Sequence, residues 1–185
     1  MQTPSQRIVL GTVTYDNSKE QISQFHWSIE LAAKHLLSAH NIEIEFIHRS
    51  FVDLSALKSE SFDMIVSGQT IEHVSKADAI HIFKEAWRLL KPGGVFCLDT
   101  PNRLITKLVS PKGFIHPEHQ YEYDPKELAA IGAAIGFVVE QQLAVSPMPK
   151  SAQTQCFDYD ELVRSTSFSQ DVETGFSFYL ELRKI

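Results

Sequence analysis

Short apolar runs alternate with amphipathic stretches through the middle of the chain. Residues 62–66 (FDMIV) and 95–98 (VFCL) are largely apolar and are typical of strands buried on both faces of a parallel sheet. Between them, apolar side chains recur every three or four positions, which predicts a helix from about Lys76 to Leu90. Strand, helix and strand together predict a β–α–β unit, and such units bind ligands where their strands end.

Signals for helix ends support this interpretation. Ser75 and Asp78 match a capping box, and residues 91–94 (KPGG) end the first helix. Asp124 followed by Pro125 predicts the start of a second helix, which ends at Gly136. Other expected elements are strands at 8–15, 42–47, 137–145 and 175–184, helices at 18–38 and 159–164, and an irregular excursion at 104–115.

The succession FDMIVS, TIEHV, EAWRLLKPGG and FCLDTPN carries a family resemblance. In order and spacing it resembles the middle of the class I S-adenosylmethionine-dependent methyltransferases that act on small molecules. The resemblance implies an α/β fold with a Rossmann-like, mostly parallel sheet, helices on both faces and a C-terminal antiparallel hairpin strand at the sheet edge. It also implies one domain over residues 1–185, methyltransferase activity and S-adenosyl-L-methionine as the cofactor.

The composition of the chain argues against some classes of binding partner. The chain has 185 residues and a net charge of −6, which argues against a surface dedicated to nucleic acid. No apolar run has the roughly 20 residues that a membrane span needs, and the polar N-terminus does not resemble a signal peptide. Two cysteines make no disulfide framework. We therefore expect a cytoplasmic protein with a small-molecule substrate, and neither nucleic-acid nor membrane binding.

The cofactor motif at the start of such domains is not found in this chain. The family's first strand ends in a glycine-rich loop, whereas the only glycine before residue 68 is Gly11. In one register residues 8–15 resemble the family's second strand, and Asp16 and Ser18 then bind the cofactor, with Asp16 on the ribose hydroxyls. In the other register residues 8–12 are the first strand. The first register explains the helix cap at Ser18 and is preferred.

That register implies a truncated domain that lacks its first strand. A parallel sheet without a central strand exposes edges that other strands can join. We therefore expect a dimer or other homo-oligomer, or a separate partner chain that covers the gap.

Further cofactor contacts follow from the resemblance. Ser67, Gly68 and Gln69 end the FDMIV strand and are expected to meet the methionyl part of S-adenosyl-L-methionine. The loop that contains Asp53 is expected to face the adenine ring.

Polar residues after the second central strand are the candidates for chemistry. His116 and His119 are candidate catalytic bases, because an imidazole can accept a proton near neutral pH. Asn102, Arg103 and Tyr121 are candidate substrate contacts, with Arg103 suited to an anionic group. The alternative for the histidines is that they shape a loop.

Glu72, His73 and His119 raise the question of a metal. With Gln69 they resemble the E-x-x-E-H plus distal histidine pattern of metal-assisted methyltransferases, among them small-RNA 3′-end enzymes and ubiquinone-pathway O-methyltransferases. Gln69 stands where that pattern has a carboxylate, and no metal ligand is assigned from the sequence. Two functions stay open at this point, which are methyl transfer to a small or glycan-like acceptor and a non-catalytic, methyltransferase-like binding or regulatory domain.

Overall fold

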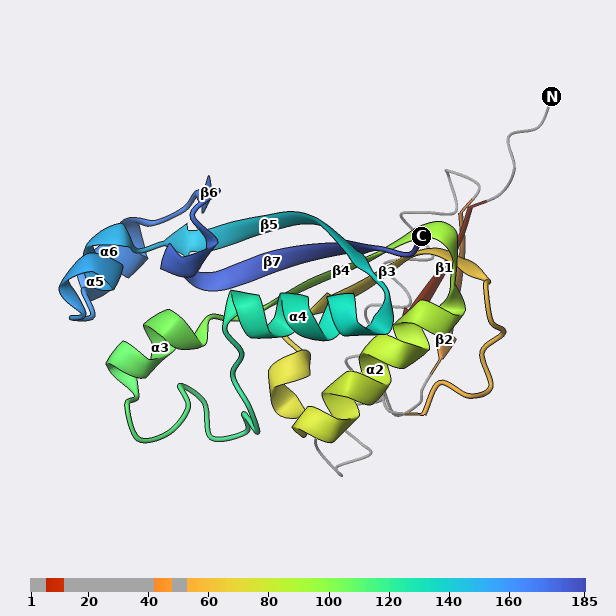
Figure 1. Ribbon diagram of the computed structural model, residues 1–185, viewed down its shortest axis with the longest axis horizontal. Helices are drawn as coiled ribbons and strands as arrows, with labels where there is room; N and C mark the ends of the chain where they lie inside the picture. Colours follow the sequence, from red (N-terminus) through yellow and green to blue (C-terminus); the bar gives the residue numbers. More distant parts are fainter. Residues whose placement is uncertain (1–5, 12–41, 48–52) are drawn as a thin grey trace. The chain divides into compact units, whose positions relative to one another are not determined.

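The computed structural model describes residues 6–11, 42–47 and 53–185 (Figure 1). The chain divides into two compact units, Met1–Ala56 and Leu57–Ile185, and each is described by itself. The prediction of one domain stays a prediction.

Two short strands are described in the first unit. β1 (Gln6–Gly11) and β2 (Ile42–Ile47) pair in parallel along their whole length. Both strands were expected, and their parallel pairing agrees with either register, because neighbouring strands of such a sheet run the same way. Asp16, Ser18 and the helix predicted between the two strands lie outside the described residues.

A five-stranded sheet organises the second unit. Its spatial order is β3-β4-β7-β5-β6, and its strands are β3 (Phe62–Gly68), β4 (Leu90–Pro101), β5 (Val138–Pro147), β6 (Phe168–Ser169) and β7 (Gly175–Arg183). β3 and β4 are parallel, and β7 is antiparallel to both β4 and β5. The mixed sheet with its helices confirms the α/β class.

Helix α2 (Lys76–Leu89) connects β3 to β4 and ends where the sequence predicts. The Ser75 hydroxyl accepts a hydrogen bond from the Asp78 backbone N–H, so the predicted cap is present. The apolar pattern of the sequence predicts Ile80 on the buried stripe, yet Ile80 is 39% exposed, while Ile82 and Leu89 are buried. The stripe is therefore rotated slightly about the helix axis.

Helix α4 (Pro125–Ile135) precedes β5 and is also bounded as predicted. The Asp124 carboxylate accepts from the Glu127 N–H at the start, and Gly136 ends the helix with φ +120°. A positive φ is readily adopted by glycine alone, which explains the abrupt end. Figure 1 shows α2 and α4 on the same side of the sheet.

These two helices cover one face of the sheet. Strand residues alternate between faces, and cross-strand partners share a face. Leu98 lies opposite Leu180 and Phe96 opposite Leu182, and each of the four is at most 2% exposed. The core of this unit is therefore the layer between β4, β7 and the two helices.

β3 is less buried than its sequence predicts. Met64 is 56% exposed and Val66 is 69% exposed, so the expectation of burial on both faces is wrong. Met64 and Val66 are two residues apart and therefore lie on the same face of β3, which is also the end strand of its sheet among the described residues. The prediction that another chain pairs along this edge stays a prediction.

The last two long strands, β5 and β7, pair antiparallel beside β4 as the resemblance implies, and only the two-residue β6 lies beyond them. One detail differs from expectation. The excursion after Arg103 begins as a helix, α3 (Arg103–Val109), whose first turn is capped by the Asn102 side chain. The remaining short elements are η2 (Ile71–His73), α5 (Pro149–Thr154), α6 (Tyr159–Arg164) and η3 (Val172–Thr174). Among the described residues, no helix has the length and apolarity to cross a membrane.

Candidate functional site

The candidate site lies at the carboxyl ends of the parallel strands β3 and β4. The chain leaves β3 through Gln69, whose φ of +45° turns it sharply. The Gln69 backbone N–H donates to the Asp99 carbonyl at 3.0 Å, and its Nε2 donates to Asp99 Oδ2 at 2.6 Å. The two strand ends are therefore joined by one residue, which positions η2 directly above them.

Glu72, in η2, is a buried carboxylate with one oxygen engaged. Its side chain is fully buried, and Oε2 accepts from the Thr100 hydroxyl at 2.9 Å. Oε1 has no hydrogen-bond partner among the described residues. Burial raises the pKa of Glu72, against the smaller lowering effects of its backbone and Thr100 hydrogen bonds. A carboxylate held this way can accept a proton or ligate a cation.

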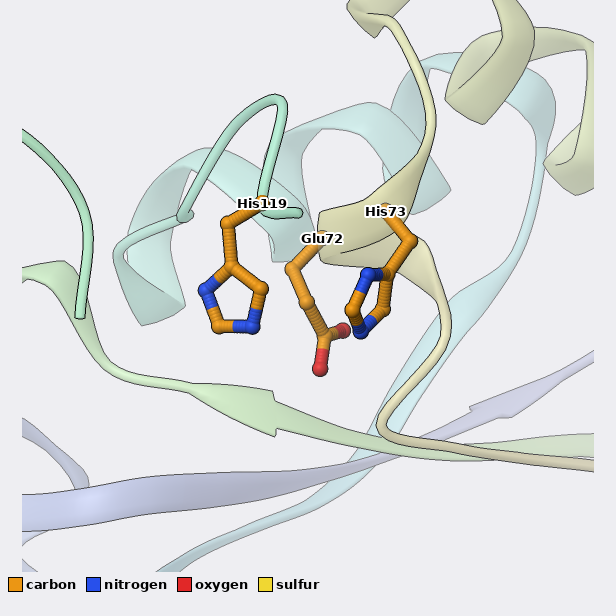
Figure 2. Close-up of side chains that lie close together, drawn as sticks. All are labelled: Glu72, His73 and His119. Atoms are coloured by element: carbon orange, nitrogen blue, oxygen red, sulfur yellow. The ribbon is translucent and has the colours of Figure 1, made fainter. Parts of the chain in front are cut away.

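Two histidines flank this carboxylate. Figure 2 shows the Glu72 side chain between the rings of His73 and His119. The two ring centroids are 4.8 Å apart with an interplanar angle of 89°. One ligand atom from each of the three residues lies within 4.8 Å of the other two.

Backbone hydrogen bonds hold the two segments together. The N–H groups of Gln120 and Tyr121 both donate to the Glu72 carbonyl, at 2.8 and 3.1 Å. The Gln120 side-chain amide donates to the His73 carbonyl at 2.9 Å. His119 is therefore brought to Glu72 by main-chain pairing across 47 residues of sequence.

Glu122 is a site residue that the sequence did not predict. Its side chain is buried and accepts from the Thr106 hydroxyl and from the Ile115 N–H at 2.8 Å. Its Oε1 also lies 2.8 Å from His119 Nδ1, and its Oε2 lies 3.5 Å from an Arg103 guanidinium nitrogen. The spacing of three residues from His119 is the one signal in the sequence that could have indicated it.

The other predicted chemical residues are placed as follows. His116 is exposed, and its Nδ1 accepts from the Glu118 N–H at 3.3 Å. The Tyr121 hydroxyl donates to Glu127, and the Lys76 ammonium lies 3.8 Å from the centre of the Tyr121 ring. Tyr121 is thus engaged with the first turns of α2 and α4. Arg103 faces Glu122 and the ring of Phe114.

Asn102 is fully buried and structurally occupied. Its Oδ1 accepts from the Leu104 N–H, and its Nδ2 donates to the carbonyls of Glu173 and Gly175, each at 3.0 Å. It joins the start of α3 to the segment before β7. Its assignment to substrate is a prediction that nothing in this geometry tests.

The predicted cofactor residues are divided between the units. Ser67, Gly68 and Gln69 end β3 beside the cluster, while Asp53, in the first unit, is exposed and accepts from the Ser55 hydroxyl at 2.7 Å. An ideal Cβ at Gly68 would lie 3.2 Å from Asp99 Oδ1, so a side chain there would crowd that carboxylate. Glycine keeps this strand end open to close approach, which fits the methionyl part of the predicted cofactor.

Glu72, His73 and His119 also offer the donors of a metal site. Two imidazole nitrogens and one carboxylate oxygen suit zinc or another first-row transition metal, whereas magnesium prefers oxygen ligands. Gln69 is turned toward Asp99 by its 2.6 Å hydrogen bond. The set of possible ligands at this place is therefore Glu72, His73 and His119.

Comparison with known proteins points to one family. A family model described as a methyltransferase domain matches residues 9–98, from β1 through most of β4. Together with relatives that are named methyltransferases, this match supports a class I S-adenosylmethionine-dependent methyltransferase.

Two curated relatives are methyltransferases by name. The chain is 35% identical over 102 residues to a probable S-adenosylmethionine-dependent methyltransferase of Mycolicibacterium smegmatis, which covers 55% of this chain and 38% of the relative. It is 35% identical over 75 residues to a ubiquinone biosynthesis O-methyltransferase of Xanthomonas oryzae, covering 40% of this chain and 30% of that protein. The chain thus spans less than two fifths of the length of either relative.

The fold agrees with solved class I methyltransferases. The crystal structure of a small RNA methyltransferase matches with a TM-score of 0.66 at 16% identity, over 97% of this chain and 20% of that one. Such a likeness shows the shared fold. S-adenosyl-L-methionine is the cofactor that the family and the fold imply. The assignment of the strand-end residues of β3 to its methionyl part stays a prediction, and Asp16 and Ser18 fall outside the described residues.

Proposed function

We propose that this chain carries the catalytic centre of an S-adenosylmethionine-dependent methyltransferase that acts on the hydroxyl or amine of a small or glycan-like molecule. The observation that carries the proposal is the fully buried Glu72, with an open oxygen, beside His119 at the ends of β3 and β4. The relatives named ubiquinone biosynthesis O-methyltransferase support an oxygen acceptor. The acidic chain, with net charge −6, supports a small molecule over a nucleic acid.

The chemistry needs positioning and one proton acceptor. When bound, the cofactor supplies a methyl group on a positively charged sulfur. An acceptor that took this methyl group in place of the sulfur would have to lose its own proton. His119 is the proposed base, since its Nδ1 is engaged by Glu122 and its Nε2 is left to receive that proton.

A metal is the second route by which the same three side chains could assist. A cation held by Glu72, His73 and His119 would bind the acceptor oxygen and favour its ionised form. The open Oε1 of Glu72 is the observation that favours it. In this route His119 is a ligand and the proton leaves to solvent.

Three groups of residues are proposed to bind the reactants. Ser67, Gly68 and Gln69 would hold the methionyl part of the cofactor, and Asp16 with Ser18 its ribose. Arg103, 25% exposed and beside Glu122, would meet an anionic group on the substrate.

The first experiment separates enzyme from binding module. Calorimetric titration with S-adenosylhomocysteine should give heat and raise the melting temperature, because a ligand of the native state stabilises it. No heat and no thermal shift would leave the non-catalytic alternative.

The second experiment tests the site itself. Glu72→Gln should retain S-adenosylhomocysteine binding and lower the rate of methyl transfer by about 10²–10⁴-fold, the range for a lost acid–base or ligand group. Glu118→Gln makes the same chemical change on an exposed residue of the neighbouring loop and should leave the rate unchanged. Transfer that persists unchanged after exhaustive chelation excludes the metal route and leaves His119 as base.

A further inference from the structure

Glu122 has an unusual environment for a residue in a loop. Its carboxylate is buried, and four groups from α3 and from the segment that follows it meet the carboxylate, which are the Thr106 hydroxyl, the Arg103 guanidinium, the Ile115 N–H and the His119 ring. Burying a carboxylate costs free energy unless donors surround it, and here they do. This much enclosure is more than a loop needs for its shape.

The hydrogen-bond donors around Glu122 determine which ring nitrogen of His119 carries the proton. The Ile115 N–H can only donate, and so can the Arg103 guanidinium. Both carboxylate oxygens of Glu122 are therefore acceptors, and the 2.8 Å contact from His119 Nδ1 to Oε1 requires the proton to be on Nδ1. Neutral His119 then has a bare Nε2.

His116 has the opposite arrangement. Its Nδ1 accepts from the Glu118 N–H at 3.3 Å, so neutral His116 carries its proton on Nε2. The two predicted catalytic histidines are three residues apart and their ring centroids are 5.5 Å apart, yet they present different groups. His119 presents a lone pair, whereas His116 presents an N–H.

We propose that Glu122 is the positioning residue of this site, which holds His119 as the Nδ1–H tautomer and aims its Nε2 lone pair at the space beside Glu72. The assignment of the His119 tautomer rests on geometry alone. Its consequence for catalysis rests on the proposed function. It applies to either route, because a base and a metal ligand both need that lone pair. Thr106 is in α3 and Arg103 begins it, so α3 is the support on which this positioning depends.

The tautomer can be read without substrate or cofactor. Long-range nitrogen–proton NMR spectra of histidine labelled with nitrogen-15 distinguish the two tautomers by the shifts of the ring nitrogens. Spectra are recorded at mildly alkaline pH, which favours the neutral form of an imidazole in general. His119 should appear as the Nδ1–H form and His116 as the Nε2–H form, and an Nε2–H form for His119 overturns the proposal.

The variant Glu122→Gln tests whether Glu122 determines the tautomer of His119. A glutamine has one acceptor oxygen for these four donor groups, so the His119 signals should shift toward a mixture of tautomers, while the exposed His81 serves as an internal reference. Methyl transfer should fall by about 10–100-fold in kcat with KM little changed, the range for outer-sphere partners of such histidines. Glu122→Asp keeps the charge and should recover part of the rate.

Controls separate this proposal from the proposed function. Glu118→Gln lies in the same loop and should change neither the His119 signals nor the rate. Unaltered signals and rate in Glu122→Gln would overturn the positioning role, and if that variant does not fold, the wild-type tautomer decides. A preparation with the expected tautomers but no methyl transfer for any acceptor would contradict the proposed function and leave the tautomer assignment intact.

Discussion

The two faces of the five-stranded sheet carry different side chains from the same strands. Toward α2 and α4, residues such as Leu98 and Leu180 are at most 2% exposed. On the opposite face Val66 is 69% exposed and Tyr179 is half-buried. Thr100, which holds Glu72, follows Leu98 on the covered face, so the candidate site is built on the rigid side of the sheet. A helix-covered face gives buried, fixed side chains, and catalytic carboxylates need such support.

Among substitutions that compare the covered and the exposed face of the sheet, one at Leu98 is expected to change the free energy of unfolding most. Leu98→Ala should lower the free energy of unfolding by about 2–5 kcal/mol, because it removes buried methyl groups and leaves a cavity between β4 and the helices. Urea denaturation followed by the fluorescence of Trp87 measures it. A loss as small as that of a surface substitution would mean that the covered face is not the core.

Gly136 should show the next largest effect. Gly136→Ala forces a side chain into φ +120°, 3.1 Å from the Trp87 ring, and should cost about 1–3 kcal/mol. Thermal denaturation gives the value. Gly113→Ala is the matched control, since its ideal Cβ meets only Ser110 Oγ at 3.6 Å, and it should be close to neutral.

Tyr123 is expected to gain stability when its hydroxyl is removed. Its side chain is fully buried, and the hydroxyl has no hydrogen-bond partner among the described residues. Tyr123→Phe should therefore raise the free energy of unfolding by about 1 kcal/mol, whereas Tyr121→Phe, which loses a bond to Glu127, should lower it by about 1 kcal/mol. Equal losses for the two variants would show that Tyr123 has a partner.

The buried hydroxyl of Tyr123 also predicts that the free energy of unfolding depends on pH. Burial raises the pKa of Tyr123 from 10.0 to about 12. Between those values the folded state holds a proton that the unfolded state releases, so stability falls as pH rises through this window. Tyr123→Phe lacks this contribution, and denaturation curves across the window should show a shallower decline than in the wild type.

The smallest effect is expected on the exposed face. Val66→Ala shortens a side chain that is 69% exposed, and its change in unfolding free energy should stay within about 0.5 kcal/mol. The same denaturation assay used for Leu98 measures it. A loss comparable to that at Leu98 would mean that Val66 is covered in solution, for instance by another chain on β3.

Local signals explain how much of the fold could be predicted. Ser75, Asp124 and Gly136 act within one helical turn, and both helices that they bound were found as expected. α3 was missed because Pro111 and Gly113 dominated the interpretation of its segment, although Asn102 is a good helix cap. The exposure of Met64 and Val66 could not be predicted, because it depends on which face of the sheet is covered and not on the sequence of the strand.

The residues of the candidate site also differ in whether the sequence could indicate them. Glu72, His73 and His119 were recognised as a set because the family pattern names them. Glu122 was not, because its role comes from α3, from Ile115 and from a loop that returns to η2, none of which is visible as spacing. The opposite tautomers of His116 and His119 likewise depend on single hydrogen bonds.

The place of β7 has a consequence for how the protein is made. A ribosome releases β4 first, then β5, and only afterwards the strand that must lie between them. Until β7 emerges from the exit tunnel, both neighbours have open edges, and the nascent chain is exposed to wrong pairing with other chains. Synthesis of this domain should therefore depend on chaperones more than its modest size suggests, and premature stop codons before β7 should yield insoluble product.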